Sequence, residues 1–178
     1  MRIGSHVDID RPICLAPMED VSDIPFRLLC KEQGADLVYT EFTNCEALIR
    51  NVKRAVAKIR VQPEERPVAI QIYGSAEDSM QRASEMATEM GPDFIDINCG
   101  CWVKKVAGRG DGAGLLRDLC KFKSVVQAVQ AGTHLPVTVK TRLGWDEHSI
   151  VITEVARMLE DLGVHALTVH CRTRKQGY

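Results

Sequence analysis

The chain has 178 residues, 45% of them hydrophobic, and its 23 Lys and Arg against 24 Asp and Glu give a net charge of −1. This composition excludes a largely disordered chain, and the near-neutral balance gives no general argument for a nucleic-acid partner. No apolar run approaches the roughly 20 residues of a membrane span, and the first residues lack the apolar core of a secretory signal, so we expect a cytoplasmic protein without a membrane partner.

Apolar segments typical of buried strands alternate with amphipathic segments typical of helices along the chain. Strands are expected at 12–18, 37–42, 67–74, 94–98, 136–142 and 166–172. Helices are expected at 24–33, 45–59, 77–90, 115–131 and 150–162. One strand and one helix about every 30 residues indicate a parallel sheet covered by helices. No linker or repeat divides the chain, so a single domain over residues 1–178 is expected.

Two architectures fit this α/β alternation. A doubly wound open sheet would be complete with six strands. A (β/α)₈ TIM barrel takes about 250 residues, so that six strands would make up six of its eight βα units. Length alone slightly favours the open sheet, and the residues at the strand ends decide between the two.

Polar side chains lie near the carboxyl ends of four predicted strands, where both architectures bind their ligands. Gln71, Asn98, Lys140 and His170 occupy equivalent positions on these strands. Polar groups inside apolar strands are rare unless they are paired or functional, above all lysine. The sequence therefore predicts a binding site at this edge of the sheet.

A glycine-rich segment at 100–114 follows the fourth strand. Cys101 lies there beside Gly100 and is followed by Lys104 and Lys105, an arrangement that suits an acid or a nucleophile. The run from Gly108 formally matches a dinucleotide-binding pattern, but it lies well past the strand end. A mobile catalytic loop that leads into a helix is the preferred interpretation.

The seven cysteines are scattered and odd in number, which predicts reduced thiols rather than a disulfide framework. Cys99 and Cys101 have one residue between them, whereas zinc sites use two to four, and no second pair exists, so no metal is expected. Three other cysteines are expected to be small buried hydrophobic residues, namely Cys14, Cys30 and Cys120.

Basic residues gather in two regions. The first lies along and just beyond the predicted helix 45–59 and is interpreted as a solvated helix face, with Arg50, Lys53, Arg54, Lys58 and Arg60. The second lies at the rim of the predicted site, where it suits phosphate contacts, with Lys104, Lys105, Arg109, Arg172, Arg174 and Lys175.

Seven ordered segments, collinear from about residue 12 to the last residue, strongly resemble the tRNA-dihydrouridine synthases. They are LAPMEDVSDIPFR (15–27), ADLVYTEF (35–42), IQIYG (70–74), DINCGC with the following VKKV (96–106), GAGLLRD (112–118), PVTVKTRLGW (136–145) and LTVHCRTRKQGY (167–178). The resemblance implies a TIM barrel that carries FMN, followed in the family by a small helical domain that holds tRNA. It also implies a chain truncated after the sixth of eight barrel units.

The resemblance implies a reaction as well, the reduction of uridines in tRNA to 5,6-dihydrouridine by FMN, with NADPH as electron donor. Cys101 would protonate the base. Asn98 and Arg142 would line the uracil and flavin region. The flavin contacts of the family fall on Ala16, Pro17, Met18, Gln71, Lys140 and His170. Trp102 departs from the family pattern, because relatives have proline after the cysteine.

Two other functions stay open from the residues. Lys140 on a barrel strand could form a Schiff base, as in an aldolase. Alternatively, the chain could be a folded but inactive fragment, or only bind RNA. The identity of the modified uridine does not follow from the sequence.

Overall fold

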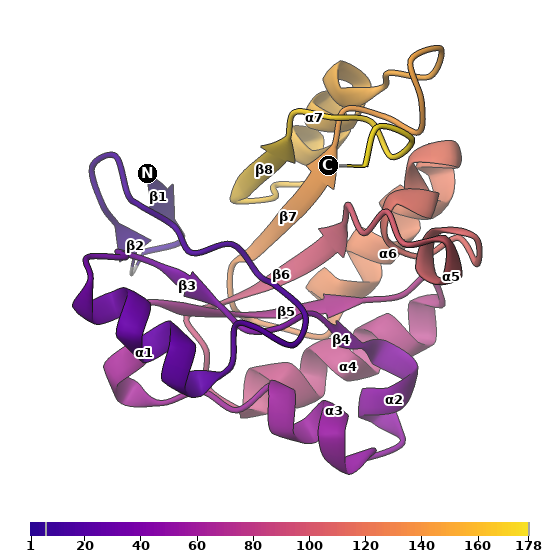
Figure 1. Ribbon diagram of the computed structural model, residues 1–178. Helices are drawn as coiled ribbons and strands as arrows, with labels where there is room; N and C mark the ends of the chain where they lie inside the picture. Colours follow the sequence, from indigo (N-terminus) through magenta and orange to yellow (C-terminus); the bar gives the residue numbers. More distant parts are fainter. Residues whose placement is uncertain (6, 178) are drawn as a thin grey trace.

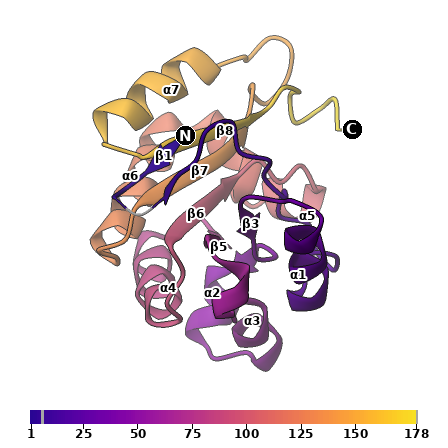
Figure 2. The same cartoon turned by 90° about the vertical axis from the view of Figure 1, so that its left-hand side faces the viewer.

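Five parallel strands follow one another in a single curled sheet in the computed structural model, which describes residues 1–5 and 7–177. They are β3 (Val38–Tyr39), β5 (Val68–Tyr73), β6 (Phe94–Cys99), β7 (Val137–Arg142) and β8 (Ala166–His170). A further short strand, β4 (Thr43–Asn44), pairs with the carboxyl end of β5. Figures 1 and 2 show the strands fanned into an arc with the helices outside it. A doubly wound sheet would reverse its order, so this arrangement confirms a partial TIM barrel.

The first predicted strand, 12–18, lies beside β3 but forms only one parallel bridge, between Cys14 and Leu37. The Leu15 N–H donates to the Leu37 carbonyl at 2.9 Å. Pro12 and Pro17 have no N–H to donate, which limits the ladder at both ends of the segment. The segment therefore holds the first barrel position without being a regular strand.

Helices cover the convex face of the sheet. The long ones are α1 (Ile24–Glu32), α4 (Glu77–Glu89), α6 (Leu119–Ala131) and α7 (Ile152–Asp161). Asp23 and Asp118 accept hydrogen bonds from the N–H groups of Phe26 and Lys121, and so cap α1 and α6. None of the described helices is long and apolar enough to cross a bilayer.

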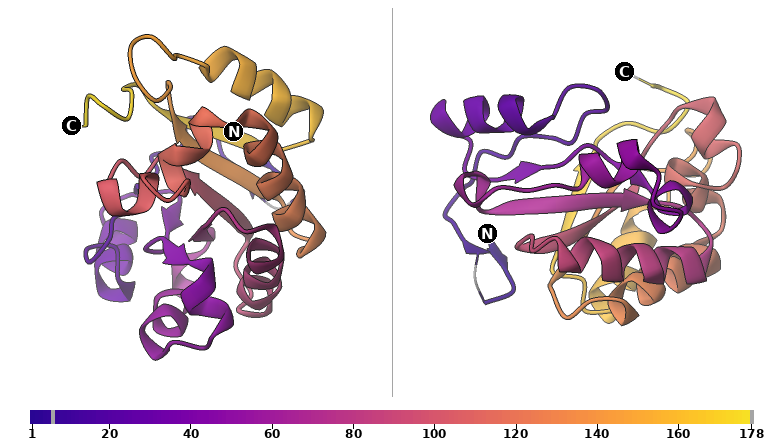
Figure 3. Two further views of the ribbon diagram at one scale, coloured as in Figure 1. Left: turned by 90° about the vertical axis from the view of Figure 1, so that its right-hand side faces the viewer. Right: turned by 90° about the horizontal axis from the view of Figure 1, so that it is seen from below.

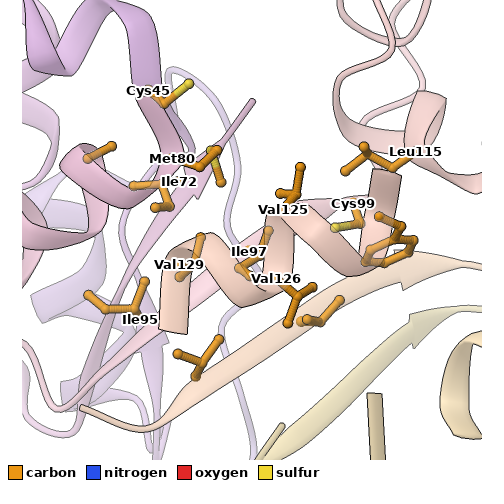
Figure 4. Packing of buried hydrophobic residues seen from close by; sticks show 14 of the residues in the cluster. Cys45, Ile72, Met80, Ile95, Ile97, Cys99, Leu115, Val125, Val126 and Val129 are labelled. Atoms are coloured by element: carbon orange, nitrogen blue, oxygen red, sulfur yellow. The ribbon is translucent and has the colours of Figure 1, made fainter. Parts of the chain in front are cut away.

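The main core lies between the sheet and these helices. Strand residues alternate between the two faces, so Ile95, Ile97 and Cys99 of β6 point outward. They pack in one cluster with Val125 and Val129 of α6, as Figure 4 shows. Figure 3 shows α4 and α6 lying side by side over this cluster.

Two predicted helices have different bounds. The segment at 45–59 forms two helices, α2 (Cys45–Ile49) and α3 (Lys53–Lys58). Asn51 has φ +54° between them, a left-handed conformation that asparagine tolerates and that ends a helix. The helix predicted from residue 115 begins at Leu119, after the 3₁₀ segment η2 (Gly112–Arg117).

A hairpin at the amino terminus was not predicted. It pairs β1 (Arg2–Ile3) with β2 (Val7–Asp8), strands too short to show a hydrophobic period. Ile3 and Val7 pack against Tyr39, Ala69 and Phe94, which lie at the amino ends of the barrel strands. The hairpin thus fills the bottom of the barrel interior and leaves the carboxyl end open.

Candidate active site

The concave face of the sheet changes from apolar to polar along the strands. Phe94, Asp96 and Asn98 of β6 point to this face in that order, and Thr138, Lys140 and Arg142 of β7 do the same. The apolar end contacts the amino-terminal hairpin. The polar end therefore faces the open side of the barrel.

A cavity of about 420 Å³ lies over this polar end. Of the nine predicted site residues, seven line it: Pro17, Met18, Asn98, Cys101, Lys140, Arg142 and His170. Gln71 is fully buried and lies beneath Asn98, and Ala16 is not among the lining residues. The apolar part of the cavity wall consists of Val21, Phe42, Trp102 and Val103.

Asn98 connects the floor of the cavity to the loop that carries Cys101. Its Nδ2 donates to Gln71 Oε1 at 2.9 Å. Its Oδ1 accepts from the N–H groups of Gly100 at 3.0 Å and Cys101 at 2.9 Å. Asn98 therefore ties the start of this loop to the buried Gln71.

Arg142 is buried and joins two loops at the cavity edge. Its Nε donates to the Gly100 carbonyl at 2.8 Å, and its Nη1 donates to the carbonyls of Thr173 at 3.1 Å and Gly177 at 2.8 Å. The sequence suggested only a substrate contact for this residue. The structure adds a role in fixing the chain after β6 and after β8.

Burial is the main cause of the pKa shifts of Lys140 and His170 in the cavity. It lowers the pKa of Lys140, which Arg142 also lowers and the nearby Asp96 carboxyl raises. Burial likewise lowers the pKa of His170, with further lowering by Arg142, Lys140 and Arg172. His170 is therefore neutral near pH 7, and Lys140 and Arg142 are the cations that line the cavity.

The surroundings of Cys101 favour the acid over the nucleophile, the two roles that the sequence left open. Burial raises its pKa, and this outweighs the opposing effects of the Val103 backbone and Arg142. Lys104 and Lys105 are exposed to solvent. The thiol consequently keeps its proton at neutral pH, which suits a proton donor better than a nucleophile.

The other cysteines are placed differently from the prediction. Cys14 and Cys120 are exposed and Cys30 is half-buried, so the expectation that these three are buried packing residues was wrong. Cys45 and Cys99 are the buried ones, and all seven cysteines are free thiols. Cys14 lies on an irregular edge segment and Cys120 in the first turn of α6, positions that apolar patterning does not resolve.

The glycine-rich segment is held more tightly than a mobile loop. It contains α5 (Lys104–Ala107) and η2, and Gly112 and Gly114 are buried. Gly112 has φ +54°, and a Cβ there would lie 2.9 Å from the Cys101 Cβ. Only glycine fits beside Cys101 in this conformation.

Gly112→Ala is expected to displace Cys101, whereas Gly110→Ala is a matched control with φ +92° and nothing within 4 Å of its added Cβ. Both variants should lose about 1–2 kcal/mol of stability from the left-handed backbone. Only Gly112→Ala should change the rate of iodoacetamide alkylation at Cys101, measured by mass spectrometry. Equal alkylation rates in the two variants would argue against this contact.

Asp96 is a fully buried carboxyl beneath Lys140, and burial raises its pKa to about 6 against hydrogen bonds from Thr138 and Gln71 and the charge of Lys140. The folded protein thus binds this proton more tightly than the unfolded chain. The free energy of unfolding should fall as pH rises from about 4 to 6.

We expect the stability of the wild type, relative to Asp96→Asn, to drop by about 2 kcal/mol between pH 4 and pH 7. Urea unfolding of both proteins at each pH measures it, and the comparison cancels the other titrating groups. A difference that does not change with pH would contradict a buried, titrating Asp96.

Most of the basic region around α3 is exposed to solvent, as the sequence suggested, and Lys58 is the exception. The Lys58 side chain is only 11% exposed, and its Nζ pairs with Glu19 and, at 3.2 Å, with Glu41 Oε1. Glu41 also accepts from the Asp20 N–H at 2.7 Å. These contacts tie the loop after the first barrel segment, which carries Met18, to α3.

The same contacts account for a cluster of carboxylates. Glu19, Asp20 and Glu41 bring their oxygens within 4.8 Å of one another. Lys58 pairs with all three, and Arg54 pairs with Asp20. Neutralisation by these cations explains the cluster without a bound ion.

Part of the basic rim is engaged within the protein. The guanidinium groups of Arg117 and Arg174 both stack on the Trp145 ring, with their central carbons 4.9 and 4.7 Å from the ring centroid. Lys175 pairs with Asp146 at 2.9 Å. Other basic residues of the rim stay exposed, namely Lys104, Lys105, Arg109 and Arg172.

Comparison with known proteins agrees with this geometry. The family model described as Dihydrouridine synthase (Dus) matches residues 14–178. The chain is 36% identical over 179 residues to a probable tRNA-dihydrouridine synthase 1 of Synechocystis, and 36% over 178 residues to tRNA-dihydrouridine synthase B of Pseudomonas aeruginosa. Each alignment covers 100% of this chain but only 50% and 53% of the relative, so the chain spans about half the length of these relatives.

A solved structure supports the fold independently. A variant of NCR from Zymomonas mobilis superimposes with a TM-score of 0.67 at 18% identity, covering 95% of this chain and 67% of that protein. The matched range, residues 14–178, includes all the residues that line the cavity. By these matches, the chain belongs to the dihydrouridine synthase family.

Proposed function

We propose that this chain forms part of the catalytic barrel of an FMN-dependent enzyme that reduces uridines in tRNA to 5,6-dihydrouridine, with NADPH as the electron donor. The observation that carries the proposal is the cavity that a half-buried lysine and a protonated thiol both line. Among the described residues, Lys140 donates no side-chain hydrogen bond, so its ammonium is available to a ligand. Family membership supports the choice of reaction.

The cavity suits a flavin by the chemistry of its donors. An isoalloxazine ring is flat and largely apolar, with one polar edge. Pro17 and Met18 offer apolar contact, and Lys140 and His170 offer polar groups on the floor. When bound, FMN would supply two-electron hydride chemistry, and the positive charge of Lys140 would favour an electron-rich ring.

The remaining residues have roles that follow from their contacts. Cys101 holds a proton at Sγ on the cavity wall, where an acid is needed when a hydride reaches the other carbon of the base. Asn98 and Arg142 position its loop. Trp102 and Val103 add apolar surface to the cavity, and the exposed cations of the rim suit RNA phosphates.

The test is to reconstitute the protein with FMN and NADPH, incubate it with an unmodified tRNA transcript, and map dihydrouridine. We expect a visible flavin absorbance band and modification at discrete uridines. Lys140→Met should weaken FMN binding by about tenfold, the effect of one charge-assisted contact. Flavin binding without any dihydrouridine would favour an inactive fragment instead.

A Schiff-base aldolase is a second candidate, because burial lowers the pKa of Lys140 and so favours a neutral amine. Asp96 opposes that shift. Treatment with an aldehyde and borohydride should leave Lys140 unmodified if the flavin function is right. A stoichiometric covalent adduct at Lys140 would favour the aldolase.

A further inference from the structure

A continuous chain of hydrogen bonds runs from the bottom of the polar layer to the backbone of Cys101. Gln71 Nε2 donates to Asp96 Oδ2 at 2.6 Å. Asn98 Nδ2 donates to Gln71 Oε1 at 2.9 Å, and Asn98 Oδ1 accepts from the Cys101 N–H at 2.9 Å. Asp96 is the only ionisable group in this chain of contacts and is fully buried.

The chemistry of the two ends sets the direction of every amide between them. An ionised carboxylate only accepts hydrogen bonds, so Gln71 must turn its NH₂ to Asp96 and its oxygen to Asn98. Asn98 must then donate through Nδ2, which leaves Oδ1 to face the backbone N–H groups. The Cys101 N–H only donates, so both ends require the same arrangement.

We propose that Asp96 is a positioning residue, which orients Gln71 and Asn98 so that the loop of Cys101 starts in a fixed place. This inference rests on the proposed function only for its catalytic consequence. The structural part concerns the loop alone and is measurable without flavin or RNA.

Two substitutions of Asp96 distinguish the effect of its charge from the effect of its hydrogen bonds. Thr138 Oγ1 donates to Asp96 Oδ1, outside the path to Cys101. Asp96→Asn removes the charge but keeps an oxygen that accepts from Gln71, and its NH₂ group can donate a hydrogen bond to Thr138 Oγ1. Asp96→Leu removes both, and leaves the Gln71 NH₂ without an acceptor.

The experiment measures iodoacetamide alkylation of Cys101 in the flavin-free protein, then uridine reduction and flavin reduction separately. Cys101 should be alkylated about five- to tenfold faster in Asp96→Leu than in the wild type, because a hydrogen bond that holds its loop is weakened. Its uridine reduction should fall by about 10²-fold, with a much smaller change in flavin reduction. Asp96→Asn should stay near the wild type, and so should Thr138→Val, the matched control off the path.

Gln71→Met interrupts the path at its next residue and guards against a failure of Asp96→Leu to fold. It should reproduce the faster alkylation of Cys101. Unchanged alkylation in folded Asp96→Leu or Gln71→Met would overturn the proposal, as would equal effects in Thr138→Val. Altered alkylation in a protein that makes no dihydrouridine would contradict the proposed function and leave the positioning role supported.

Discussion

Cys101→Ala is expected to slow uridine reduction by about 10²–10⁴, the usual contribution of a positioned acid. Burial raises the pKa of the thiol, so the group carries its proton at neutral pH and has one to give. Reduction of the flavin by NADPH needs no proton from this wall of the cavity, and it should stay near the wild-type rate. Single-turnover kinetics with separate flavin and dihydrouridine readouts measures the two steps.

Cys99→Ala is the matched control, two residues away on the same strand end. Its side chain is fully buried in the cluster between sheet and helices, on the face opposite to the cavity. Truncating it should cost some stability but leave the ratio of the two rates unchanged. Near-normal dihydrouridine formation in Cys101→Ala, or its loss in Cys99→Ala alone, would refute the assignment of the acid.

The site was largely predictable because parallel strands deliver residues to a common edge. Asn98, Lys140 and His170 are separated by tens of residues in the chain, yet register pairs Asn98 with Lys140 and places His170 beside Arg142. A reader of the sequence needs only the strand positions to bring these side chains together. The strand order was predictable for the same reason, although Pro12 and Pro17 reduce the first strand to one bridge.

Contacts that join loops and helices were not predictable. Lys58 looks like one of several lysines and arginines on a helix face, and nothing local marks Glu19 and Glu41 as its partners. Similarly, the break at Asn51 depends on one backbone angle in an otherwise helical pattern. The role of Asp96 was also hidden, because it depends on hydrogen bonds through the Gln71 and Asn98 amides, which no sequence pattern reveals.

The buried ion pair of Arg27 and Glu65 is another contact that the sequence did not predict, and we expect it to stabilise the packing of α1. Arg27 is 1% exposed and Glu65 is fully buried in the 3₁₀ segment η1 (Pro63–Glu65). Arg27 Nη2 reaches the Glu65 oxygens at 3.1 and 3.0 Å and the Arg60 carbonyl at 3.0 Å, and Nη1 reaches the Ser22 carbonyl at 2.7 Å. One guanidinium thus joins the segments before and after the second barrel unit.

Arg27→Leu is expected to lower the free energy of unfolding by about 3–5 kcal/mol, because it leaves the Glu65 carboxylate buried without a counter-charge. The double variant Arg27→Leu/Glu65→Leu should recover much of that loss, since no charge is then left unpaired. Arg50→Leu is the control: its pair with Glu46 has the same chemistry, but the Arg50 side chain is 72% exposed, and it should cost at most about 1 kcal/mol. Urea unfolding of the four proteins gives the comparison. If Arg27→Leu costs no more stability than Arg50→Leu, the buried pair does not hold α1 against η1. If the double variant is no more stable than Arg27→Leu, the loss comes from the carbonyl contacts of Arg27 and not from the unpaired charge of Glu65.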